Sequence, residues 1–166
     1  MTRRRRFFSV EDGFTVLDLV QSAVDHLLSA RALFQWNPRG LDSAGYLSHL
    51  ALELLYKALL LEKTQAFPGE HSLLTLHSQL AETGLVVQLG EAGVAVLRDL
   101  DQFKELRYPK PDDPVSIGTE DWGRIATAAN SLLVQVPKDV HQRLTAKANE
   151  PVVKGGRVLM RKKIDP

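Results

Sequence analysis

A stripe of ionisable side chains interrupts an otherwise apolar stretch of the sequence. His49, Glu53 and Lys57 stand four positions apart, a spacing that places them on one face of a helix. In this order Glu53 and Lys57 form a favourable ion pair, worth about 0.3–0.5 kcal/mol on a surface. Two interpretations follow. The residues form a surface pair of that strength, or they line a cleft, where burial would make either partner costly to remove.

A second candidate pair, Arg107 and Tyr108, stands where a helical pattern stops before the proline-rich loop 109–114. An arginine near a helix C-terminus is stabilised by the helix dipole by about 0.3–1 kcal/mol. Beside this structural interpretation stands a functional one, in which Arg107, Tyr108, His71 and the stripe line one groove for a nucleotide or another anionic group. The predicted binding residues are therefore His49, Glu53, Lys57, His71, Arg107 and Tyr108.

Helical spacing of apolar residues predicts the elements that position these side chains. The expected helices cover residues 14–36, 43–64, 71–82, 91–107 and 119–134, and residues 138–148 continue the last one beyond Pro137. No strand is predicted in this body, so we expect an all-α, up-and-down bundle of four to five helices. The 43–64 helix is apolar nearly all round, which places it at the bundle centre or against a second subunit.

Charge is distributed unevenly along the 166 residues, whose formal net charge is +1. The two ends are basic and the body between them is acidic. We predict one bundle domain at residues 11–149, a basic arm at 1–10 and a basic tail at 150–166, where Gly155-Gly156 indicates a β-hairpin. The ends are either solvated and disordered or bind nucleic acid; the predicted contacts are Arg3, Arg4, Arg5, Arg6, Arg157, Arg161, Lys162 and Lys163.

Composition excludes several kinds of site. The sequence has no cysteine, hence no disulfide, thiolate metal site or cysteine nucleophile. Its five histidines lack metal-ligand spacing, and no phosphate-binding glycine loop occurs, so neither a metal nor a cofactor is predicted. No apolar run approaches the roughly 20 residues of a membrane span, and no export signal follows the N-terminal arginines. We expect a cytoplasmic protein without membrane contact.

Three stretches resemble the HEPN domain family, the "higher eukaryotes and prokaryotes nucleotide-binding" domain. They are AGYLSHLALELLYKALL (44–60), FPGEHSLLTL (67–76) and LRYP (106–109), and the resemblance covers roughly residues 12–135. It implies a helical bundle that forms homodimers and often works beside a nucleotidyltransferase in toxin–antitoxin or defence systems. Many members are metal-independent ribonucleases.

The ribonuclease motif of that family is an arginine followed, after four to six residues, by a histidine. The imidazole moves the proton of an RNA 2′-hydroxyl, and the guanidinium holds the phosphate. Arg107 matches the arginine, but positions 112–114 are Asp-Asp-Pro, and no other arginine has a histidine at this spacing. We therefore expect no catalytic residue and a dimeric, non-catalytic binding or regulatory module for a nucleotide, RNA or nucleotidyltransferase. The alternatives are a ribonuclease with a changed site and a small-ligand-binding or structural helical dimer.

Overall fold

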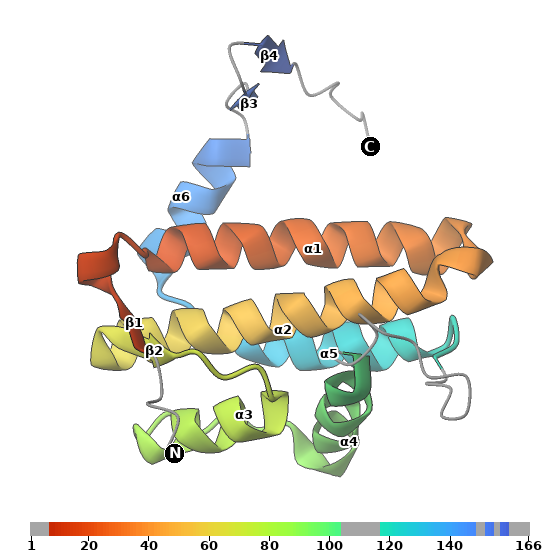
Figure 1. The fold of residues 1–166 in the computed structure, drawn as a ribbon, viewed down its shortest axis with the longest axis horizontal. Helices are drawn as coiled ribbons and strands as arrows, with labels where there is room; N and C mark the ends of the chain where they lie inside the picture. The colour runs from red at the N-terminus through yellow and green to blue at the C-terminus, as the bar shows by residue number, and fades with distance from the viewer. Residues whose placement is uncertain (1–6, 104–116, 149–151, 155–156, 160–166) are drawn as a thin grey trace, which may run out of the picture. The chain divides into compact units, whose positions relative to one another are not determined.

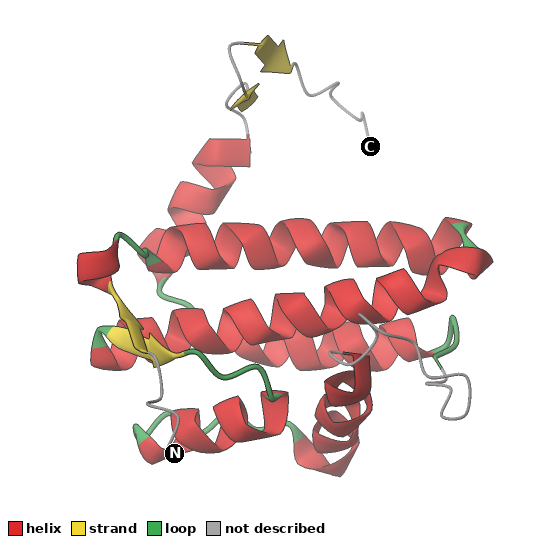
Figure 2. Ribbon diagram, in the orientation of Figure 1, coloured by secondary structure: helices red, strands yellow, loops and turns green. Residues whose placement is uncertain are grey.

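The computed structural model describes residues 7–103, 117–148, 152–154 and 157–159. These residues form six α-helices and two small sheets (Figures 1 and 2). The helices are α1 (Val16–Trp36), α2 (Leu41–Thr64), α3 (Leu73–Glu82), α4 (Gly90–Asp101), α5 (Asp121–Leu133) and α6 (Lys138–Ala148). The predicted helical fold is confirmed. By their contacts the residues separate into two compact units, 1–136 and 137–166, whereas the sequence placed residues 138–148 with the bundle.

The central helix of the first unit is α2. It contacts α1, α3, α4 and α5, and it runs beside α1 along most of its length (Figure 1). Fourteen of its residues are buried, and each buried leucine contributes about 1.5–3 kcal/mol through loss of apolar surface to water. Elements of the same chain therefore cover the apolar circumference of α2, so this helix lies at the bundle centre and needs no second subunit to bury it.

Local capping explains where these helices begin and end. Thr15 precedes α1 and accepts a hydrogen bond from the Asp18 amide at 3.1 Å, and Ser72 accepts one from the Thr75 amide at the start of α3. Both satisfy an amide that has no partner within its own helix. At the other end of α2, Gln65 adopts a left-handed conformation with φ 61°, which turns the chain out of the helix.

Two short strands lie in the first unit, where none was predicted. Strand β1 (Phe7–Ser9) pairs antiparallel with β2 (Ala66–Pro68), so residues 7–9 of the predicted arm belong to the folded body. The Phe8 ring stacks on Phe67 with centroids 5.5 Å apart, and Phe14 meets Phe67 edge-on at 5.2 Å. This aromatic cluster holds the N-terminal segment beside the end of α2. Strands of three residues are too short to be predicted from an alternation of apolar and polar residues.

The second unit contains α6 and the predicted tail hairpin. Strands β3 (Val152–Lys154) and β4 (Arg157–Leu159) pair antiparallel, with Val152 opposite Leu159, as the Gly155-Gly156 signal indicated. None of the helices in the described parts of the chain is long and apolar enough to cross a membrane.

Candidate functional site

The stripe on α2 is buried. His49, Glu53 and Lys57 are 1%, 5% and 6% exposed, and the Lys57 ammonium donates a hydrogen bond to Glu53 Oε1 at 2.5 Å. Lys57 Nζ also lies 5.7 Å from the centre of the Phe67 ring, a cation–π contact that links the stripe to the aromatic cluster. The surface-pair interpretation is therefore wrong. A buried ion pair needs further hydrogen bonds to offset the desolvation of its charges.

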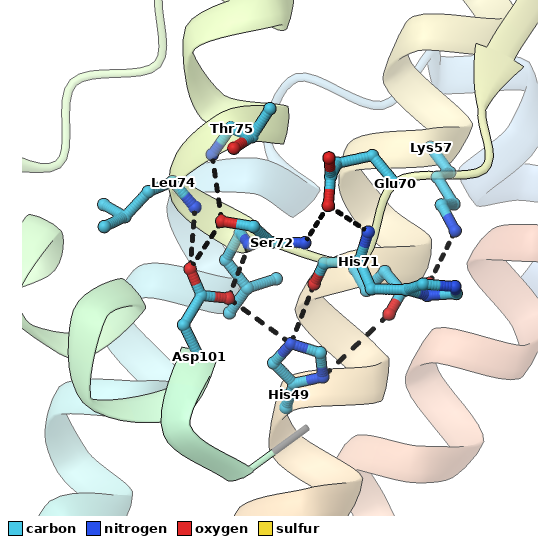
Figure 3. Close-up of polar contacts among 10 residues, drawn as sticks. His49, Lys57, Glu70, His71, Ser72, Leu74, Thr75 and Asp101 are labelled. Carbon is cyan, nitrogen blue, oxygen red and sulfur yellow. Dashed lines mark hydrogen bonds and ion pairs between the residues drawn. The ribbon is translucent and has the colours of Figure 1, made fainter. Parts of the chain in front are cut away.

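His71 supplies one of these further hydrogen bonds, and Figure 3 shows its backbone contacts with Glu70 and His49. Its Nδ1 lies 3.0 Å from Glu53 Oε1 and is the donor, because an ionised carboxylate can only accept. The backbone of His71 is fixed as well: its amide donates to Glu70 Oε1 at 2.7 Å, and its carbonyl oxygen lies 3.0 Å from His49 Nε2. Yet 65% of the His71 side chain is exposed, which leaves Nε2 as the ring nitrogen available to a ligand.

Asp101, at the end of α4, caps the start of α3. Its carboxylate accepts hydrogen bonds from the amides of Leu73 and Leu74, at 2.6 and 3.3 Å, and from the Ser72 hydroxyl at 2.8 Å. Burial by itself would raise the pKa of Asp101, but hydrogen bonds from His49, Leu73, Ser72 and Leu74 together outweigh it and lower the pKa below its ordinary value of 3.8. The carboxylate is therefore ionised at neutral pH, at the positive end of a helix dipole.

His49 lies between the two carboxylates. Its Nε2 faces two acceptors, the His71 carbonyl oxygen at 3.0 Å and Asp101 Oδ1 at 3.4 Å, so this nitrogen carries a hydrogen. Its Nδ1 lies 3.9 Å from Glu53 Oε2, and neither atom has a hydrogen-bond partner in the described parts of the chain. At this distance the two atoms do not form a hydrogen bond with each other.

The structure thus brings together four of the six predicted binding residues: His49, Glu53, Lys57 and His71. Three of them are interior, and only His71 reaches solvent; Arg107 and Tyr108 lie outside the described residues. Sequence reasoning missed Asp101, which stands 28 residues beyond its partner Leu73. The sequence held one indication of this contact. Ser72 is a residue type typical of a helix N-cap, and the positive end of a helix dipole attracts a carboxylate.

The remaining predicted contacts cannot be placed in a site. Arg157 lies in β4, and the other basic residues predicted to contact nucleic acid, Arg3, Arg4, Arg5, Arg6, Arg161, Lys162 and Lys163, lie outside the described residues. Within the described ranges, no group of three or more histidine, aspartate or glutamate side chains could hold a metal ion.

Removal of the Lys57 ammonium should destabilise the fold strongly. We expect Lys57→Met to lower the free energy of unfolding by about 3–5 kcal/mol, because it leaves a buried carboxylate without its cation. Glu53→Gln/Lys57→Met should recover part of that loss. Urea unfolding of each variant measures both effects.

Arg124→Met is a matched control, because Arg124 forms exposed ion pairs with Asp99 and Asp121 at 3.1 and 2.8 Å. Its loss should stay within about 1 kcal/mol. Equal losses for the two single variants would contradict a structural role for the buried pair.

Comparison with known proteins places this bundle in a family. The chain matches the HEPN domain over residues 16–134, which is more than half of its length. A search of curated proteins and a search of solved structures gave no match. The matched residues begin with α1 and run to the end of α5, and they include the stripe on α2, His71 and Asp101. The chain belongs to the HEPN domain family.

Proposed function

We propose that the chain is a dimeric, non-catalytic binding and regulatory module. Its partner is a nucleotide or a nucleotidyltransferase, in a toxin–antitoxin or defence system. Membership of the HEPN family supports the general class, and the partner follows from what the resemblance implies. An acidic body with basic ends suits a chain that meets its partner through charge complementarity.

The observation that carries the non-catalytic assignment is the use of the stripe for internal contacts. Lys57 pairs with Glu53, and His49 contacts the backbone of His71 and the carboxylate of Asp101. Acid–base chemistry on RNA needs an accessible imidazole and a cation on the scissile phosphate. His71 meets the first need, but the Lys57 ammonium, which contacts the same carboxylate oxygen as His71, is buried in its ion pair with Glu53 and is not available to a phosphate.

One observation favours the second candidate, a metal-independent ribonuclease with a changed site. The exposed imidazole of His71 donates through Nδ1 to the buried carboxylate of Glu53, which is how carboxylates orient catalytic histidines. In this candidate Nε2 of His71 would accept the proton of the 2′-hydroxyl. The same carboxylate oxygen is already neutralised by Lys57 at 2.5 Å, which weakens its influence on the imidazole and favours the binding role.

RNA cleavage separates the two candidates. Single-stranded RNA incubated with the purified full chain in the presence of a chelator should remain intact, because the Lys57 ammonium that shares Glu53 Oε1 with His71 is buried and cannot hold a phosphate. Any RNA affinity should come from the basic ends and should fall steeply with salt. Cleavage that survives repurification, disappears in His71→Gln and persists in the control His26→Gln would establish the ribonuclease and reject the non-catalytic module.

Dimerisation must use a surface other than α2, which the chain covers by itself. The far end of α1 carries the most exposed large apolar side chain of the described residues, Trp36, at 81%, and Leu28 on the same helix is 54% exposed. Tryptophan is enriched in interfaces, where its large ring anchors the contact. We assign the dimer contact to this end of α1.

Sedimentation equilibrium at tens of micromolar tests this assignment. The unaltered chain should have the mass of a dimer, and Trp36→Gln should shift it toward the monomer. Val10→Gln is the control, because Val10 is also exposed, at 44%, but lies in the segment before α1. A monomeric mass for the unaltered chain would rule out the dimer; a dimer that withstands Trp36→Gln would move the contact elsewhere.

A further inference from the structure

A cavity of about 580 Å³ lies between α3, the segment before α4, and one face of α4. Its volume is within the range of about 300–1,000 Å³ typical of small-molecule sites. Val86, Val87, Leu89 and Val94 supply the apolar part of the lining. The other lining residues are Gln88, Gly90 and three with ionisable side chains, His77, Glu91 and Arg98. His49, Glu53, Lys57, His71 and Asp101 do not line this cavity, so it is separate from the site described above.

Tyr56 fixes the proton of His77. The Tyr56 hydroxyl lies 3.0 Å from His77 Nδ1, and the tyrosine is fully buried, with no other hydrogen-bond partner in the described residues. Burial raises the pKa of Tyr56, so the phenol keeps its hydrogen. The opposite arrangement would leave that hydrogen buried without an acceptor, at a cost of about 1–3 kcal/mol. The hydroxyl therefore donates to Nδ1.

A neutral imidazole that accepts at Nδ1 carries its hydrogen on Nε2. Burial lowers the pKa of His77, which keeps the ring neutral at physiological pH. Nε2 has no partner among the described residues, and His77 is only half-buried where it lines the cavity. The cavity is thus provided with a neutral hydrogen-bond donor whose orientation is set from the core.

The charged groups of the cavity are arranged along one face of α4. Glu91, Val94 and Arg98 stand at helical spacing on that face, with Glu91 and Arg98 two turns apart, or about 10 Å. Arg98 is exposed and has no ion-pair partner among the described residues, unlike Arg124, which contacts two carboxylates. The cavity therefore has a positive end at Arg98, apolar walls, and a negative end at Glu91.

We propose that this cavity binds a small organic monoanion, whose acidic group contacts Arg98 and the Nε2–H of His77 and whose apolar body covers the valine-lined wall. A guanidinium and a neutral donor together suit one carboxylate or phosphate-type group. Glu91 repels a second negative charge at the other end of the ligand, so polyanions such as RNA are excluded. The inference goes beyond the proposed function and does not depend on it.

Titration with 8-anilinonaphthalene-1-sulfonate tests the site directly, because this fluorescent probe combines one anionic group with apolar rings. We expect saturable binding with one probe per chain. Arg98→Gln should weaken binding about tenfold, through loss of a charge-assisted hydrogen bond. Arg31→Gln removes an exposed cation of α1 and should leave the affinity for the probe unchanged.

Tyr56→Phe should also weaken binding of the probe, because it releases the proton of His77 from its fixed position on Nε2. NMR of the His77 imidazole should show the change of tautomer.

Competition identifies the anionic group. Decanoate displaces the probe if the site takes carboxylates, and the singly charged diester methyl 1-naphthyl phosphate if it takes phosphate diesters; the neutral 1-naphthalenemethanol should be about tenfold weaker than either. Near-UV circular dichroism, recorded alongside, monitors the fold. Probe affinity unchanged in both Arg98→Gln and Tyr56→Phe would overturn the proposal. So would binding that appears only with loss of the near-UV signal, because partly unfolded chains also bind this probe.

Discussion

The packing of the bundle around α2 depends on one buried carboxylate, that of Glu53 in the middle of this central helix. Glu53 is 5% exposed, and an isolated charge at such a position would cost several kcal/mol. Lys57, one turn away on α2, supplies the counter-charge, and His71 supplies a second donor from the segment before α3. The need to satisfy one carboxylate thus fixes a segment 18 residues away in sequence. His49 extends the contacts to the cap of α3 at Asp101.

The same contacts separate the groups that hold the bundle together from those that can meet a partner. The N-terminus of α3 is held by Asp101, and its middle is held by Tyr56 through His77, so α2 and α4 fix this helix at two places. Two of the imidazoles in these contacts reach solvent, and each has Nδ1 occupied: His71 by a carboxylate and His77 by a phenol. The first therefore presents an acceptor at Nε2 when neutral, and the second presents a donor. The two surfaces select for different ligand chemistry.

Much of the fold was readable from the sequence because helices are encoded locally. Apolar residues at helical spacing predicted the helices, and Gly155-Gly156 predicted the tail hairpin. The four-residue spacing of His49, Glu53 and Lys57 predicted that these side chains share one face of a helix. Whether the stripe was buried could not be read, since burial depends on how α3 and α4 pack against α2. Asp101 and the pairing of β1 with β2 were missed because both depend on long-range contacts. His77 could not be singled out from the sequence, because its hydrogen-bond partner Tyr56 stands 21 residues away in the chain.

The tautomers of His71 and His49 provide the most direct test of the buried network. Long-range ¹H–¹⁵N NMR at pH 8, where an ordinary imidazole is neutral, reports which ring nitrogen carries the proton, and His71→Gln assigns the His71 signals. The Glu53-centred account requires the proton of His71 on Nδ1, held by the carboxylate, and a proton of His49 on Nε2. A proton of His71 on Nε2, with Nδ1 bare, would mean that Glu53 does not hold this histidine and would contradict the account.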